Sequence, residues 1–281
     1  MNQALNPPTA SASARLSLAF STKALGRSMA TWLFTALLGQ AFFVVYVLGF
    51  YGRHALQGQP EQWRRVLPHG WVAGDWLANA VLAGHLLFTV VILLGGAVQL
   101  LPWLRRHAPA LHRWNGRLYL VSALILSLGG LLMVWSGKAV GDLSQHLGIS
   151  LNALLILGFA WLGWRAARER RFDAHRRWML RLFLVVAGVW FFRVGLMLWL
   201  VLNQGPVGFD PKTFQGPFLT VLSFAQTLLP LALLQWVFHA QSSRKPAVKL
   251  WVAGVLLLLT LAMAVGIAAA GMLMWLPRIA A

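Results

Sequence analysis

The amino-acid sequence predicts an all-α polytopic membrane protein with seven transmembrane helices. Of its 281 residues, 59% are hydrophobic and only 11% are charged, whereas soluble domains carry about 25% charged residues. Several uncharged runs reach about 18 residues or more, which is long enough for a helix to cross a bilayer. Lys and Arg fall mainly in alternate connections between these runs, which is typical of proteins that cross a membrane repeatedly.

The seven expected helices follow from the uncharged runs. The first begins after Arg27 with no small-residue cleavage site behind it, so we interpret it as a retained helix and not as a signal peptide. The seventh repeats small residues every four positions, as closely packed membrane helices do. The expected spans are 28–50, 77–101, 117–137, 147–164, 180–202, 217–239 and 250–276. We expect residues 28–281 to form one membrane domain and the polar tail 1–27 to be disordered.

The distribution of basic residues predicts the orientation. Of 24 Lys and Arg residues, 17 lie in the amino-terminal tail and the second, fourth and sixth connections, 6 lie on the other side, and Arg193 lies within a span. The positive-inside rule then places the N-terminus in the cytoplasm and the C-terminus outside, in a bacterial inner membrane. The same rule accounts for the formal charge of +18. We therefore expect anionic lipid headgroups as partners, and no nucleic acid.

Polar residues inside the spans are the first candidates for a site. Arg193 lies about 13 Å from the outer end of its span, where a cation costs at least about 2.5–3.5 kcal/mol, and no span contains Asp or Glu. His85, Gln40 and Gln226 lie at a similar depth, and Gln99 shares a polar stripe with His85. We expect a ligand cavity in the outer half of the bundle. The alternatives are that the arginine bonds to backbone carbonyls or reaches the surface, and that the others bond helices together.

Two related segments form the second candidate. "LHRWNGRLYL" at 111–120 and "AHRRWMLRLF" at 174–183 put His112 and His175 at equivalent places, 63 residues apart, at the cytoplasmic ends of the third and fifth spans. Two facing imidazoles are able to bind a haem iron, and the neighbouring Arg113 and Arg176 are suited to its propionates. His146 is a shallower alternative partner for His85. The competing interpretation is a cationic, aromatic surface that holds lipid headgroups.

The chain resembles a family of bacterial predicted membrane proteins, domain of unknown function 2306, over roughly residues 80–200. The resemblance rests on a span that opens with His and ends near Gln, a "HRxxGRxY" turn, and a later "HRRWMxR" followed by an Arg. It implies that the His–Arg clusters and Arg193 carry a role in the family. The matching positions are His85, Gln99, His112, Arg113, Gly116, Arg117, Tyr119, His175, Arg176, Arg177, Trp178, Met179, Arg181 and Arg193.

Three functions remain open from the sequence. The first is a redox-linked membrane protein that binds b-type haem or a quinone between its helices. The second is a transporter or receptor for a small anionic or amphiphilic ligand, with Arg193 as counter-charge. The third is a non-catalytic subunit of a membrane complex with a protein partner. The chain has no cysteine, HExxH helix, phosphate-binding GKS or GKT loop, or GxSxG elbow, and whether it is an enzyme stays open.

Overall fold

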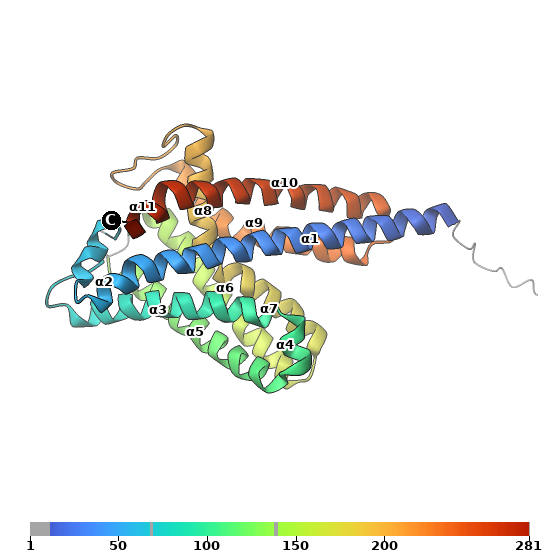
Figure 1. The fold of residues 1–281 in the computed structure, drawn as a ribbon, viewed down its shortest axis with the longest axis horizontal. Helices are drawn as coiled ribbons and strands as arrows, with labels where there is room; N and C mark the ends of the chain where they lie inside the picture. Colours follow the sequence, from blue (N-terminus) through green and yellow to red (C-terminus); the bar gives the residue numbers. More distant parts are fainter. Residues whose placement is uncertain (1–11, 68–69, 138–139, 281) are drawn as a thin grey trace, which may run out of the picture.

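The computed structural model describes residues 12–67, 70–137 and 140–280, and their regular structure is helical apart from one isolated bridge between Asp210 and Gln215. The predicted all-α membrane fold is confirmed (Figure 1). The long helices are α1 (Ala12–Tyr46), α3 (Trp76–Gln99), α5 (Pro109–Trp135), α6 (Leu143–Arg168), α9 (Pro217–Ser242) and α10 (Pro246–Ala270). The bent pair is α7 (Phe172–Val186) and α8 (Gly188–Leu202). The short elements are η1 (Val47–Gly52), α2 (Arg53–Leu56), η2 (Pro60–Arg65), α4 (Pro102–His107), η3 (Gly271–Trp275) and α11 (Leu276–Ala280).

The described helices are long and apolar enough for seven membrane crossings when the bent pair counts as one span. Six are long and apolar enough individually, and α7 with α8 pass the same criterion together. The beginning of α1 and the C-terminal end of the chain lie at opposite ends of the molecule (Figure 1), which requires an odd number of crossings. Residues 1–11, 68, 69, 138, 139 and 281 lie outside the described part of the chain, and Lys138 is one of them.

The first helix is longer than expected. Residues 12–27, which the sequence analysis assigned to a disordered tail, belong to α1, so that expectation is corrected for them. The segment is rich in Ala and Leu, has Arg15, Lys23 and Arg27 as its charged residues, and lacks Pro, which favours helix. The 35 residues of α1 span about 52 Å, so they extend beyond a hydrocarbon core of about 30 Å. The polar composition of this first part therefore reflects a helix leaving the membrane.

A bend of 49° interrupts the fifth span between α7 and α8. Asn152 of α6 stabilises it, because its side-chain amide donates hydrogen bonds to the Val185 carbonyl at 2.9 Å and to the Thr227 hydroxyl at 2.7 Å. Gly188 lets the amide approach, since a Cβ at that position would lie 2.7 Å from the Asn152 Nδ2 atom. A side chain inserted into the helical hydrogen-bond ladder is a recognised cause of kinks.

The helices form two groups that part toward one end of the molecule (Figure 1). In one group, α1 packs along α10, and α10 packs against α8. In the other, α3, α5, α6 and α7 pack in chain order. The main core between them includes the buried aromatic side chains Phe43, Phe50, Trp190 and Trp275. The two groups are thus joined by apolar packing at one end and separate toward the other.

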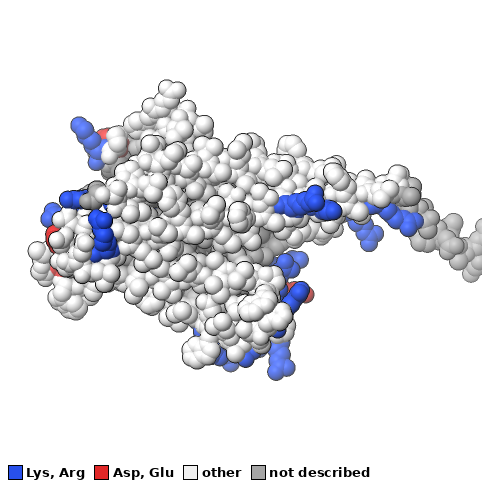
Figure 2. Space-filling model, in the orientation of Figure 1, with Lys and Arg blue, Asp and Glu red and all other residues white. Residues whose placement is uncertain are grey.

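Basic side chains gather toward the two ends of the bundle and leave an uncharged band between them on the face in Figure 2. We call one end the arginine-rich end. It consists of the start of α1 and the connections 99–109, 168–172 and 242–246 with the adjoining helix turns. This end corresponds to the side that the sequence analysis placed in the cytoplasm. It is also the end at which the two helix groups part.

Close packing between α8 and α10 depends on Gly266. A Cβ there would lie 2.5 Å from the backbone oxygen of Val194 and 2.7 Å from its Cγ1, whereas a Cβ at Gly254 on the same helix would meet nothing within 4 Å. We expect Gly266→Ala to lower the free energy of unfolding by about 1–3 kcal/mol through overpacking. Gly254→Ala, the matched control, should leave it unchanged or raise it by up to about 1 kcal/mol. Thermal unfolding in detergent measures both, and equal midpoints would contradict the prediction.

Candidate functional site

Arg193 lies between the helices near the middle of α8 without a carboxylate partner. Its guanidinium donates a hydrogen bond to the Val189 carbonyl at 3.2 Å and lies over the Phe43 ring, with Cζ 5.3 Å from the ring centroid. Within the described part of the chain, no Asp or Glu comes within ion-pair distance of it. Backbone and aromatic contacts therefore hold this cation, in agreement with one of the alternatives from the sequence.

His85 belongs to the same neighbourhood. The ring interacts electrostatically with Arg193 and packs against the α5 backbone, where a Cβ at Gly129 or Gly130 would lie 3.9 Å from it. Its Nδ1 atom is buried and has no hydrogen-bond partner. Because buried polar atoms are almost always paired, this nitrogen is a candidate contact for a ligand or a water molecule.

Gln40 is buried on α1, one turn before Phe43, and both of its amide atoms lack partners. It lines a cavity of about 30 Å³ together with Leu93, Leu94 and Ala97 of α3. Gln40 is the polar side chain of this otherwise apolar cavity, whose size is sufficient for one water molecule. Arg193 and His85 share one neighbourhood, and Gln40 lies one turn before Phe43, the α1 residue that contacts Arg193. We call these three residues the central polar cluster.

Gln226 and Gln99 have other partners. The Gln226 Nε2 atom donates to the Ser223 carbonyl at 2.9 Å while its Oε1 is buried without a partner, on the part of α9 that faces α6. The Gln99 Nε2 atom donates to the backbone carbonyl of His112 at 2.8 Å. The structure thus brings His85 and Arg193 together, whereas the contacts of Gln99 connect it to the arginine-rich end.

Several residues near Arg193 were not anticipated from the sequence. Tyr46 and Tyr51 interact electrostatically with the arginine, as does Arg278, and the Arg278 Nη1 atom lies 3.5 Å from the Tyr46 hydroxyl. These residues come from α1, η1 and α11, next to two π-helical segments, η1 and η3. Such segments occur often at functional sites. The sequence offered one sign of this region, because two of the three tyrosines of the chain, Tyr46 and Tyr51, lie close together in it.

His112 and His175 lie at the arginine-rich end on two helices that start there. Each is the fourth residue of its helix, in α5 and α7 respectively, and the two side chains interact electrostatically. The His112 Nδ1 atom is buried without a hydrogen-bond partner. The two histidines therefore occupy the same position in their helices, and both helices pack against α6.

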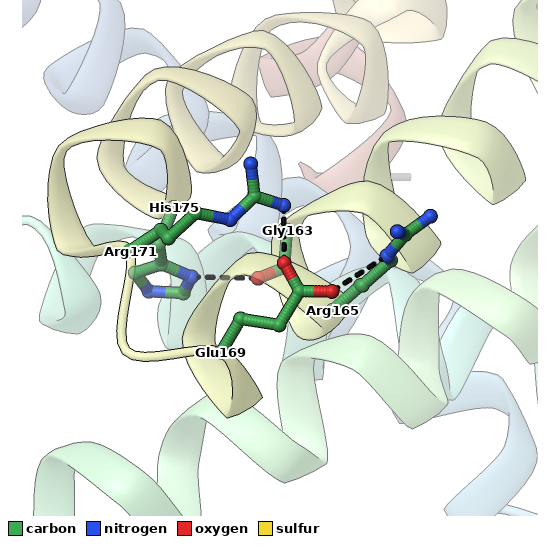
Figure 3. A network of polar contacts seen from close by, with 5 residues as sticks. All are labelled: Gly163, Arg165, Glu169, Arg171 and His175. Atoms are coloured by element: carbon green, nitrogen blue, oxygen red, sulfur yellow. Dashed lines mark hydrogen bonds and ion pairs between the residues drawn. The ribbon is translucent and has the colours of Figure 1, made fainter.

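The His175 ring is oriented by the helix beside it. Its Nδ1 atom lies 2.9 Å from the Gly163 carbonyl of α6 (Figure 3). Since a carbonyl oxygen only accepts, Nδ1 carries the proton, and in the neutral ring Nε2 keeps its lone pair. Metal-binding histidines are commonly held in this way, with the second nitrogen donating to a backbone carbonyl.

The turn that carries α7 is stabilised by a small ionic network (Figure 3). The Glu169 carboxylate pairs with Arg165 at 2.8 Å and with Arg171. Hydrogen bonds from these two arginines lower the pKa of Glu169 below its ordinary value. Arg170 takes a left-handed backbone conformation with φ of 58° in the same turn. The network thus contributes to fixing the start of α7, and with it His175.

The two arginines predicted beside these histidines have different surroundings. Arg113, with Arg105, interacts electrostatically with His112. Arg176 instead lines a groove between α7 and α9. Among the described residues, no group of three or more His, Asp or Glu side chains is arranged to hold a metal ion. A haem iron needs fewer protein ligands, because its porphyrin supplies four nitrogen ligands and the protein supplies one or two.

A substitution of Arg193 tests whether this cation serves structure or a ligand. Replacing an unpaired cation inside a membrane with a similar apolar side chain removes an insertion cost of at least about 2.5 kcal/mol. We therefore expect Arg193→Met to keep or raise the thermal unfolding midpoint in detergent. Asn152→Leu is the comparison, because it removes two hydrogen bonds and leaves a buried carbonyl unpaired, which costs about 1–3 kcal/mol. A larger loss for Arg193→Met than for Asn152→Leu would show that the arginine is structural.

Comparison with known proteins identifies one family. The family described as "Predicted membrane protein (DUF2306)" matches residues 82–214, from the first half of α3 to the connection after α8. No curated protein and no solved structure is detectably similar to the chain. The matched segment contains His85, His112, His175 and Arg193 and ends before α9 and α10. Residues 82–214 are similar to the DUF2306 family of predicted membrane proteins, as the resemblance in the sequence indicated.

Proposed function

We propose that this integral membrane protein is redox-linked and binds a b-type haem at its arginine-rich end, with His112 and His175 as the axial ligands. The observation that carries the proposal is the matched placement of the two imidazoles, each in the first turn of a helix, with His175 close enough to act electrostatically on His112. A haem with two histidine ligands transfers one electron at a time.

The helix arrangement supports a ligand pair that spans the bundle. α6 packs against both α5 and α7, so the two histidines come from helices that share a neighbour. Both helices begin at the same end and run in the same direction, which keeps the two side chains at the same depth.

Hydrogen bonding and charge support the same site. His175 already has the orientation expected of an iron ligand, because Nδ1 donates to Gly163 and Nε2 remains available. The Nδ1 atom of His112 lacks a partner, and an acceptor supplied by a bound group or water would satisfy it. Arg105 and Arg113 lie near His112 and are the arginines best placed for the haem propionates.

We place the haem site on the cytoplasmic side of the membrane. Following the positive-inside rule, the arginine-rich end faces the cytoplasm of a bacterial cell, and the membrane is the inner membrane. Electron exchange at this site then takes place near the cytoplasmic surface.

An absorbance spectrum tests the haem site. The protein is expressed with haem precursor, purified in mild detergent, and its Soret absorbance is divided by protein concentration. We expect His112→Ala and His175→Ala each to lower haem occupancy at least about tenfold, because even outer-shell changes reduce metal affinity by that factor. His107→Ala and His239→Ala are the controls, since both histidines are exposed at the same end and should leave occupancy unchanged.

Two results would contradict the haem site. One is a colourless wild-type protein that also gains no Soret band when haem is added. The other is a coloured protein whose spectrum survives both substitutions, which would move the haem elsewhere and return the two clusters to lipid anchoring.

The central polar cluster supports a second candidate, a ligand rich in hydrogen-bond acceptors, such as a quinone headgroup or a small organic anion. Gln40 and His85 present buried nitrogen atoms without partners, and the Trp190 indole nitrogen is another. Arg193 adds positive charge, and no carboxylate among the described residues pairs with it. These groups match carbonyl or carboxylate oxygens, which only accept.

A thermal-shift assay distinguishes this candidate. A short-chain quinone and a series of organic anions are added to the purified protein, and the expected result is a higher unfolding midpoint that rises with ligand concentration. His85→Ala and Arg193→Met should abolish the shift, whereas His239→Ala should retain it. No shift with either ligand class, or a shift that survives both substitutions, would contradict a ligand in the central polar cluster.

A further inference from the structure

We propose that the groove between the two helix groups at the arginine-rich end binds an anionic phospholipid, with one acyl chain inside and the phosphate at the basic mouth. The groove has a volume of about 520 Å³, within the range of small-molecule sites. It lies between α1, α7, α9 and α10, where Figure 1 shows the helix groups parting. Its side chains are Met29, Trp32, Leu33, Leu100, Asp173, Ala174, Arg176, Arg177, Leu180, Phe183, Leu184, Pro230, Leu233, Leu234, Val237, Phe238, Gln241 and Leu256.

The dimensions of the groove match one leaflet of a bilayer. Along α7 its lining runs from Asp173 to Leu184, and along α9 from Gln241 to Pro230. Each stretch covers twelve residues, whose eleven rises span about 16 Å of helix. This is about half of a hydrocarbon core of about 30 Å. The groove thus reaches from the arginine-rich surface to the middle of the membrane, which is the extent of a single acyl chain.

The polarity of the lining changes along this length. Arg176, Arg177, Asp173 and Gln241 lie at the mouth, and the deeper part is formed by Leu, Phe, Val and Pro side chains. Two arginines against one aspartate leave the mouth positive, and the guanidinium of Arg177 lies over the Phe238 ring with Cζ 5.4 Å from its centroid. A negative headgroup and an apolar tail are therefore both accommodated, which favours an anionic phospholipid over a zwitterionic one.

The mouth is reinforced by a third arginine next to the groove. Arg181 lies over the rings of Trp178 and Phe238 and donates to the Gln235 side chain at 3.1 Å. No acidic side chain pairs with Arg176, Arg177 or Arg181 among the described residues. Their positive charge is consequently available to a phosphate, and each basic residue near such a surface contributes measurably to lipid affinity.

Native mass spectrometry tests the proposal. The full-length protein is released from nanodiscs that contain equal amounts of phosphatidylglycerol and phosphatidylcholine with identical acyl chains. We expect one retained phosphatidylglycerol per protein. The double variant Arg176→Gln and Arg177→Gln should retain it at least about tenfold less, given about 1 kcal/mol for each arginine. The matched control, Arg106→Gln with Arg170→Gln, removes two exposed arginines of the same end outside the groove and should retain it.

A second variant tests the acyl-chain part. Leu180→Trp places a large side chain in the groove and should displace the retained lipid, whereas Leu257→Trp on the exposed face of α10 should not. Equal retention in the arginine double variant and its control would overturn the anionic headgroup. If the Leu180→Trp variant still retains the lipid, the groove is not the lipid site. If the wild-type protein is a dimer and Leu180→Trp dissociates it, the groove holds a second copy of the protein and not a lipid. Soret absorbance, read on the same samples, reports the haem proposal separately.

Discussion

Backbone carbonyl groups hold the polar side chains of this membrane domain, because its spans contain no carboxylate to do so. Lys249 bonds to the Ala240 and Gln241 carbonyls at the end of α9, Arg193 bonds to Val189, and Asn152 bonds to Val185. A hydrocarbon environment makes an unpaired polar group costly, so each of these side chains is tied to a helix end, a bend or a neighbouring turn. The positions of helix ends and bends therefore determine where polar chemistry is located.

The sequence was a good guide to the number and order of the helices and a poor guide to irregularities within them. Hydrophobic runs are long and unambiguous here, so the spans were predictable from composition alone. The bend at Ala187 was not, because it depends on Asn152, an amide 35 positions away in the chain that reaches it only after folding. The helical start of α1 was missed for a different reason. Polarity was interpreted as disorder, although a helix that leaves the membrane is polar as well.

The candidate sites were likewise predictable from the sequence only in part. The equivalence of His112 and His175 was visible in the sequence because both lie in a repeated local pattern, and local patterns determine position within a helix. The surroundings of Arg193 were not visible, because Phe43, Tyr46 and Arg278 come from distant segments. The groove was also missed, since the sequence placed Arg177 in a His–Arg cluster but gave no sign of the apolar side chains that pack beside it. The position of a residue along its helix follows from the nearby sequence. The residues that it contacts on other helices depend on how the whole chain packs.

The bend in the fifth span connects these sites structurally. α7, before the bend, packs against α6 and α9 and carries His175 on one face and the groove residues Arg176 and Arg177 on another. α8, after the bend, packs against α10 and carries Arg193. A straight helix could not follow both directions, which differ by 49°. The hydrogen bonds of Asn152 thus allow one span to join the helix group at the arginine-rich end to the group that encloses the central polar cluster.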